Sequence, residues 1–336
     1  MAAAMSRRER VQAAVRGEQP DRVPWSLWRH FYERESTADQ LADVMVGWQL
    51  RHDFDLLKVN PRAHYHVEDW GARYRYSGDP HQRPERLDYP VKRADDWRRL
   101  QPNDPARGAL GEQLQALRQI RQRLGQDLVM VETVFLPLMI AEYLADSPDA
   151  LRRDIESDPS AVHQALGVIV ETFNAFTARC LEAGADGFFF ATTWGVPSKL
   201  PPELYAEFGR PYDLQVIETA RTAGARTNVL HVCGDGARVF DFADYPAELF
   251  SYAATSPANP GLGETAGKMP GAVIGGLSAE SVTEADPSRA KAEAERARAA
   301  TGGRHWLLGG PCSLSTHERD ETLQAAARAV GIPAPA

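Results

Sequence analysis

The chain has 336 residues, of which 43% are apolar and 25% charged, and it carries a formal net charge of −8. These are globular values, and the length is normal for one large α/β domain. The acidic balance argues against a nucleic-acid-binding protein, which would present a basic surface. The three cysteines, Cys180, Cys233 and Cys312, are too few and odd in number for a disulfide framework.

The N-terminal segment "MAAAMSRRERVQAAV" lacks the apolar stretch of a signal peptide. No window of the sequence approaches 18 uninterrupted apolar residues, so we expect no membrane span. Sparse cysteines suit a reducing compartment. The sequence therefore predicts a cytoplasmic protein.

Helical and strand-like segments alternate along the chain. The first segment, "SRRERVQAAVRG", reads as a helix with Ser6 as its N-cap and Gly17 as its stop. Eight short apolar segments then read as strands, over residues 22–28, 54–60, 127–135, 186–192, 227–233, 247–254, 272–278 and 305–312. Apolar residues recur at helical spacing over residues 37–51, 109–124, 159–183, 202–223, 283–300 and 317–331.

This alternation predicts a single (β/α)8 barrel that spans residues 1–336. Residues 71–108, rich in Arg, Pro and Asp, interrupt the pattern after the second strand, and we expect an inserted loop or hairpin there. A doubly wound sheet is the alternative, but no G-x-G-x-x-G segment follows the first strand. In a barrel, the chemistry belongs at the C-terminal ends of the strands.

Side chains that can bind ligands or take part in catalysis occur at these strand ends. They are Arg29, His30, Lys58, Asn60, Glu132, Thr192, Thr193, His231, Cys233, Ser278 and Cys312. In a strand, residues two apart point to the same face, so the H-x-C of His231 and Cys233 delivers both side chains inward. Cys312 can join them through the fold. One imidazole and two thiols are ligands that suit Zn²⁺, and three protein ligands are typical of catalytic zinc.

A buried cysteine is more often a small apolar core residue, and H-x-C alone is weak evidence for a metal. The strand-end position, the flanking glycines and the second strand end "GGPC" favour zinc. Two thiolates and a neutral imidazole offset the charge of the ion. Such a centre would deprotonate a substrate thiol at neutral pH, where a free thiol with a pKa of about 8.5 is mostly protonated. We expect Cys180 to be core packing.

Several other residues have both a functional and a structural interpretation. Arg29 is expected to clamp an anionic group of the substrate together with His30, or else to form an ion pair with Glu33 or Glu35. Lys58 would need a carboxylate partner inside a barrel, for which Asp55 and Glu132 are the candidates. Asp235 is a candidate to hydrogen-bond the ligating histidine.

The segment "HYHVEDWG" clusters His64, His66, Glu68 and Asp69 after the second strand. Its H-x-H pattern would suit a second metal, but a polar lid satisfied by hydrogen bonds is the favoured interpretation. Glu68 is kept as a catalytic candidate that orients the substrate.

The stretches "RRERVQAAVRGEQPDRVPWSLW", "HVCGDG" and "LLGGPCSL" resemble the uroporphyrinogen decarboxylase superfamily. Within it, H-x-C paired with a distant cysteine is similar to the methylcobamide:thiol methyltransferases, including the methylcobamide:coenzyme M enzymes. The resemblance implies a (β/α)8 barrel that binds zinc through His231, Cys233 and Cys312, activates a thiol and accepts a methyl group from a corrinoid protein.

The sequence also departs from the family patterns. Arg29 fits the first arginine of a decarboxylase R-x-x-x-R run, but Glu33 stands at the second. The histidine of the decarboxylase L-G-H-G turn is missing from "LGGPC", whereas Tyr143 fits a decarboxylase tyrosine. The carboxylate that the zinc branch supplies from the strand after H-x-C has no counterpart in "AELFSYAATSP", which leaves Glu132, Glu68 or a water for that position.

The leading hypothesis is a zinc-dependent methyltransferase that binds its substrate at Arg29, His30, Lys58, Thr192 and Thr193. The chain has no cobalamin-binding D-x-H-x-x-G segment, so the corrinoid is expected on a partner protein. A homodimer is left open. The alternatives are a decarboxylase or other tetrapyrrole-handling enzyme, a zinc-dependent thiol alkyltransferase acting on another electrophile, and a non-catalytic barrel that binds a corrinoid or a partner.

Overall fold

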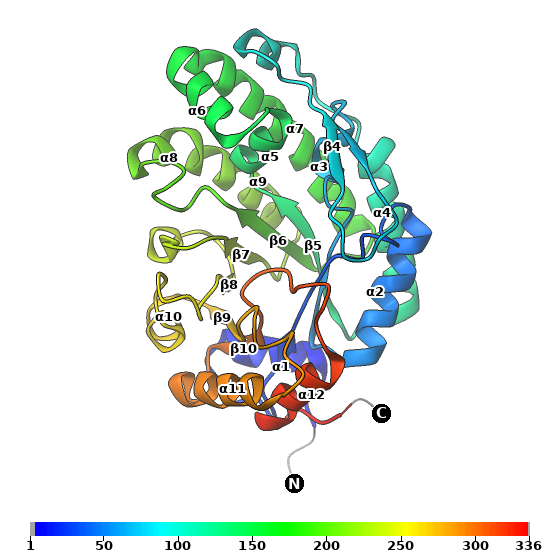
Figure 1. Cartoon of the computed structure of the whole chain (residues 1–336), viewed down its shortest axis with the longest axis vertical. Coiled ribbons are helices and arrows are strands. Elements are labelled where there is room, and N and C mark those ends of the chain that lie inside the picture. Colours follow the sequence, from blue (N-terminus) through cyan, green and yellow to red (C-terminus); the bar gives the residue numbers. More distant parts are fainter. Residues whose placement is uncertain (1–3, 335–336) are drawn as a thin grey trace.

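The computed structural model describes residues 4–334 and forms an eight-stranded parallel barrel surrounded by helices (Figure 1). The strands of the barrel are β1 (Trp25–Ser26), β2 (Leu56–Val59), β5 (Val129–Phe135), β6 (Gly187–Thr192), β7 (Val229–Val232), β8 (Leu249–Ser251), β9 (Ala272–Gly276) and β10 (Trp306–Gly309). They follow the order β1-β10-β9-β8-β7-β6-β5-β2, and every ladder is parallel. The (β/α)8 prediction and all eight predicted strands are confirmed.

The barrel is closed between its first two strands by the backbone N–H of Asp55, which donates to the carbonyl oxygen of Trp25 at 3.1 Å. Alternate residues of each strand point into the barrel or out toward the helices. The interior holds one small apolar cluster that includes Val131, Phe189 and Val229, whereas the larger core lies between the strands and the helices. The position of a residue in this alternation, which we call its parity, therefore decides whether its side chain can reach the barrel mouth.

The helical layer is built mainly from the predicted segments. Its helices are α1 (Arg7–Val15), α2 (Ala38–His52), α3 (Tyr65–Glu68), α4 (Gly108–Leu124), α5 (Pro137–Leu144), α6 (Pro148–Ser157), α7 (Pro159–Glu182), α8 (Pro202–Phe208), α9 (Arg210–Thr222), α10 (Leu262–Lys268), α11 (Ser288–Thr301) and α12 (Asp320–Ala329). Ser6 caps α1, as predicted, and it forms a capping box with Glu9. The predicted helix over 202–223 is divided at Gly209 into α8 and α9.

The insertion after β2 contains an antiparallel hairpin, β3 (Arg73–Arg75) and β4 (Glu85–Asp88), and the short 3₁₀ helix η1 (Ala94–Arg99). The tip of the hairpin reaches the loop that follows β10. There His81 bonds the hydroxyl of Thr316 at 3.0 Å and stacks on His317 at 3.9 Å between ring centroids. In Figure 1 the hairpin is drawn in cyan, and its second strand carries the label β4. The predicted hairpin thus joins the second and the last strand-end loops of the barrel.

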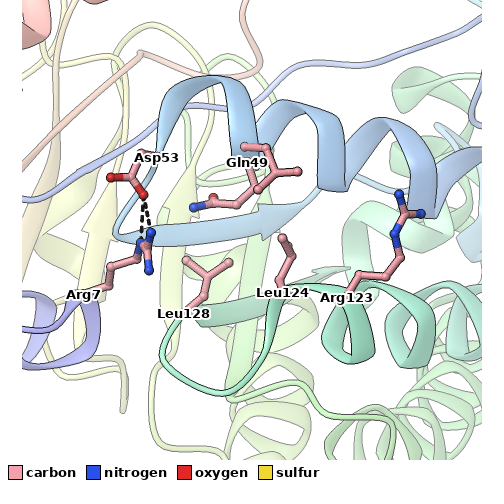
Figure 2. A pocket seen from close by; sticks show the side chains of 7 residues that line it. Arg7, Gln49, Asp53, Arg123, Leu124 and Leu128 are labelled. Carbon is pink, nitrogen blue, oxygen red and sulfur yellow. Dashed lines mark hydrogen bonds and ion pairs between the residues drawn. The ribbon is translucent and has the colours of Figure 1, made fainter. Parts of the chain in front are cut away.

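One surface pocket lies at the other end of the barrel. It has a volume of about 310 Å³ and is lined by α1, α2 and the segment around Leu124 and Leu128, where the Arg7–Asp53 ion pair crosses it (Figure 2). Asp53 and Leu128 precede β2 and β5, so this pocket faces the N-terminal ends of the strands, away from the predicted chemistry. Among the described residues, no helix is both long and apolar enough to cross a bilayer.

Candidate metal centre

The three predicted zinc ligands come together at the mouth of the barrel. His231 lies in β7 and Cys233 follows it directly, so both share the inward parity of Val229. Cys312 lies in the loop after β10. One ligand atom from each of the three residues lies within 4.8 Å of the other two, and this is the one such cluster of three or more potential metal ligands among residues 4–334.

The donor set fits zinc. The two sulfur atoms are 3.6 Å apart, close to the separation of about 3.8 Å that two ligands 2.3 Å from one tetrahedral zinc would have. A disulfide would need about 2.05 Å, and all three cysteines are free. His231 is 2% exposed, and its Nε2 is buried without a hydrogen-bond partner. A buried imidazole nitrogen beside two thiols is therefore free to take a metal.

The imidazole is oriented by Ser251 at the end of β8. Nδ1 of His231 lies 3.1 Å from the hydroxyl of Ser251, which is its direct neighbour in the β7–β8 ladder. If Nδ1 carries the proton, Nε2 keeps its lone pair for the metal, as ligating histidines require. Asp235 was a candidate for this role, with capping of the next helix as the alternative, and it accepts a hydrogen bond from Ser256 at 2.7 Å instead.

The two thiols influence each other strongly. The hydrogen bond from Cys233 lowers the pKa of Cys312, and the neighbouring His231 lowers it further. The same contact raises the pKa of Cys233. One proton is thus shared between two adjacent sulfurs, and the pair carries one thiolate readily. Cys180, by contrast, is fully buried on α7, as expected for core packing.

Lys58 points into the barrel below the three ligands. It is 3% exposed, bonds the side-chain oxygen of Asn60 and lies over the rings of Phe189 and Trp28 at 4.6 and 5.5 Å. Burial lowers the pKa of Lys58 to about 7, against the opposing attraction of the Cys312 thiolate. The prediction that Asp55 pairs with Lys58 is wrong, because Asp55 lies at the opposite end of the barrel.

Asp55 instead accepts hydrogen bonds from two arginines there, Arg10 and Arg22, each at 2.7 Å. The other predicted partner of Lys58, Glu132, forms no ion pair with it among the described contacts. Glu132 has the opposite parity from Val131 and faces the helices. There it accepts hydrogen bonds from Gln113 at 2.9 and 3.0 Å and from the hydroxyl of Tyr65.

Glu132 was one of three candidates for the fourth zinc position, beside Glu68 and a water, and its carboxylate is engaged on the helix side and is not part of the three-residue cluster. Burial raises the pKa of Glu132 to about 8. Thr192 also has outward parity, and its hydroxyl accepts the backbone N–H of Trp194 at 3.0 Å. The alternation of a strand explains both outcomes, because each residue is offset by one from an inward position.

Thr193 does lie at the mouth, in a polar group that the sequence did not predict. Its hydroxyl contacts Glu142 at 3.2 Å and accepts a hydrogen bond from Lys199 at 2.7 Å, and Lys199 also pairs with Glu142 at 2.7 Å. The Lys199 charge is close enough to Cys233 to lower its pKa, although the bond to Cys312 outweighs this effect.

Arg29 and His30 lie in the loop after β1, and both have carboxylate partners. Arg29 is paired with Glu318 at 2.6 Å, and these side chains are 13% and 5% exposed. His30 contacts Glu35 at 3.1 Å. The predicted alternative partners of Arg29, Glu33 and Glu35, are therefore wrong, since the actual partner comes from the loop after β10.

The "HYHVEDWG" segment forms α3 and its flanks, and its two histidines take separate places. His66 accepts the N–H of Phe135 at 3.0 Å, whereas His64 stacks on Tyr74 at 3.8 Å. The two histidines therefore do not share one site, although Nδ1 of each and Oε1 of Glu68 are buried without a hydrogen-bond partner, so the segment is not a lid whose polar groups are all satisfied. Tyr143 on α5 packs against His64 and Phe135, and burial raises its pKa.

The sequence matches the family model described as uroporphyrinogen decarboxylase (URO-D) over residues 6–331. The chain therefore belongs to the URO-D family. It is 20% identical over 241 residues to the methylcobamide:CoM methyltransferase MtbA of Methanosarcina acetivorans, covering 68% of this chain and 70% of that protein. It is 29% identical over 160 residues to the uroporphyrinogen decarboxylase of Thioalkalivibrio sulfidiphilus, covering 45% of each chain.

A solved methyltransferase from Methanosarcina mazei has the same fold. It superposes with a TM-score of 0.79 at 19% identity, covering 97% of this chain and 98% of the other. A B12-independent methionine synthase from Shewanella sp. W3-18-1 superposes less closely, with a TM-score of 0.57 at 13% identity, covering 91% of this chain and 96% of the other. Relatives of the chain thus carry both methyltransferase and decarboxylase names.

Proposed function

We propose that this protein is a zinc-dependent methyltransferase that activates a small thiol and accepts a methyl group from a methyl-corrinoid carried by a partner protein. The observation that carries the proposal is the cluster of His231, Cys233 and Cys312 at the C-terminal end of the barrel. When bound there, zinc would lower the pKa of a thiol in its fourth position so that the thiolate forms at neutral pH.

The residues of the chain supply the rest of the site. Ser251 contacts Nδ1 of His231, which leaves Nε2 without a hydrogen-bond partner and available for a metal. Thr193, Glu142 and Lys199 form a polar wall beside Cys233, where a substrate can be oriented. The apolar interior cluster beneath Lys58 closes the floor of the barrel against water. The methyltransferase names of MtbA and of the Methanosarcina mazei structure support methyl transfer as the reaction class.

Uroporphyrinogen decarboxylation is the weaker alternative, although several relatives carry that name. Arg29 would have to hold a substrate carboxylate, but Glu318 already occupies its guanidinium. Glu33 adds a further negative charge to the same loop. A substrate with many carboxylates would meet repulsion there, whereas a small thiol would not.

The test compares two cysteine variants in the same protein. We expect wild type and Cys180→Ser to bind about one zinc per chain and to demethylate methylcobalamin only when a thiol is added. Demethylation is measured by the change in corrinoid absorbance. Cys312→Ser should lose both properties while keeping its circular dichroism spectrum. Folded wild-type protein that binds no metal would refute the proposal. Metal-loaded protein that ignores methylcobalamin but alkylates thiols with an epoxide would favour the alternative alkyltransferase.

A further inference from the structure

Lys58 is a buried cation without a carboxylate partner. Among residues 4–334, the buried lysine and arginine side chains are Arg10, Lys58 and Arg121. Arg10 pairs with Asp55 at 2.7 Å, and Arg121 pairs with Asp186 at 2.7 Å. Lys58 forms no ion pair with a described carboxylate. Because a buried ammonium is costly unless a negative charge offsets its lost hydration, the counter-charge of Lys58 must come from another kind of group.

The surroundings of Lys58 are aromatic. Its Nζ lies 4.6 Å from the centre of the Phe189 ring and 5.5 Å from that of Trp28. These two rings meet edge-on, with 5.0 Å between their centroids. The ammonium also donates a hydrogen bond to the side-chain oxygen of Asn60. Aromatic faces and an amide oxygen attract a cation but carry no net charge, so they hold the ammonium in place without neutralising it.

The same two rings connect this ammonium to the metal centre. The Phe189 ring stacks on the imidazole of His231, with 5.2 Å between centroids and 30° between planes. The backbone carbonyl of Trp28 accepts the N–H of Leu314 at 2.8 Å, two residues after Cys312. One ring therefore separates the ammonium from the metal-binding imidazole, and the other belongs to the segment that pairs with the Cys312 loop.

The other cations near the mouth are paired or screened. Lys199 pairs with Glu142 at 2.7 Å. Arg29 pairs with Glu318 at 2.6 Å. Arg83, in the hairpin, is exposed, so solvent screens its charge. None of these side chains combines burial with the lack of a carboxylate partner, as the ammonium below the ligands does.

Two buried acids, Glu35 and Glu132, act on Lys58 through their charges, but neither forms an ion pair with it. The Glu35 carboxylate accepts hydrogen bonds from two backbone N–H groups, at 3.0 and 3.1 Å, and contacts His30 at 3.1 Å. Glu132 faces the helices, and burial raises its pKa to about 8, so it is mostly protonated at neutral pH. The thiolates of the metal centre are therefore left to balance the ammonium.

With a divalent ion bound, the charge of the cluster becomes more negative when a thiol coordinates. Two thiolates and a neutral imidazole offset the ion. Coordination of the thiol then forms a metal–sulfur bond and releases one proton to solvent, which leaves one uncompensated negative charge in a water-poor interior. We propose that the ammonium of Lys58 is the counter-charge that stabilises the bound substrate thiolate. This rests on the proposed thiol-activating function.

The test measures ligand binding to the Co²⁺-substituted protein by its visible absorption spectrum. 2-Mercaptoethanol adds a negative charge when it coordinates as a thiolate, whereas imidazole adds none. At pH 7 we expect Lys58→Met and Lys58→Gln to bind the thiol about tenfold more weakly than wild type, and to bind imidazole within about twofold of wild type. The pH at which half of the protein binds the thiol should rise by about one unit, which is the same loss on the pH scale.

Lys291→Met is the matched control, because Lys291 is exposed on α11 and its loss changes the net charge equally. It should bind both ligands as wild type does. In urea titrations the metal-free Lys58 variants should be at least as stable as wild type, since no ion pair is lost. Clearly lower stability would show a structural role for Lys58 and overturn the inference.

Two outcomes separate this inference from the proposed function. An unchanged ratio of thiol to imidazole affinity in the Lys58 variants would overturn the counter-charge and leave thiol activation intact. If 2-mercaptoethanol does not change the cobalt spectrum of wild type, both the proposed function and this inference fail.

Discussion

Replacing Ser251 by alanine tests whether the orientation of His231 matters for metal binding. Ser251 is 1% exposed, and its hydroxyl is the partner of Nδ1 of His231 at 3.1 Å. Without it, the ring loses its fixed orientation, and a buried N–H is left unpaired at a cost of about 1–3 kcal/mol. Partners of this kind are typically worth 10–100-fold in metal affinity, or about 1.4–2.7 kcal/mol.

We therefore expect Ser251→Ala to bind zinc 10–100-fold more weakly than wild type in a competition titration with a chromophoric chelator. Ser256→Ala is the control, because Ser256 bonds Asp235 in the next loop rather than the imidazole. Its affinity should stay within twofold of wild type. A folded Ser251→Ala protein with wild-type affinity would show that Ser251 does not orient the ligand.

Three further predictions follow from other contacts. Glu132→Gln should keep its metal, and its unfolding free energy should depend less on pH than that of wild type. The reason is that burial raises the pKa of the Glu132 carboxyl from 4.5 to about 8. Because the native state holds that proton longer, wild type should lose stability as pH rises from 4.5 to 8, by up to a few kcal/mol, in urea titrations; identical slopes would contradict this. Metal-free protein treated with hydrogen peroxide should form a Cys233–Cys312 disulfide. The two thiols give two electrons and two protons to the peroxide, which becomes two waters. Peptide mapping should find this disulfide and a reduced Cys180. Asp69→Ala should lower stability by about 1–2 kcal/mol in denaturant titrations, because Asp69 accepts the N–H groups of Ala109 and Leu110 at the start of α4; an unchanged midpoint would exclude this capping role.

The barrel could be predicted because its signals are local. Each strand is a short apolar run, and the intervening helices carry their own caps and periodicity, as with Ser6 at α1. The shorter helices α5, α6 and α10 escaped prediction, since their apolar residues cover too few turns to show a period.

The cluster of His231, Cys233 and Cys312 could be predicted because H-x-C at a strand end fixes two inward side chains. The outward direction of Glu132 and Thr192 was not predicted, because a strand end can be located to within a residue or two, but a shift of one residue reverses the face. Ser251 and the Arg29–Glu318 pair could not be predicted, because each joins segments whose register only the folded barrel defines.

The separation of the ligands along the chain has a consequence for how the protein matures. His231 and Cys233 belong to β7, the fifth strand of the barrel, whereas Cys312 follows the last strand, β10, which pairs with β1 and completes the ring. A nascent or truncated polypeptide that ends before residue 312 offers only a bidentate grip. Binding through all three side chains therefore requires the closed barrel, and by mass action a bound ion would stabilise that closed state.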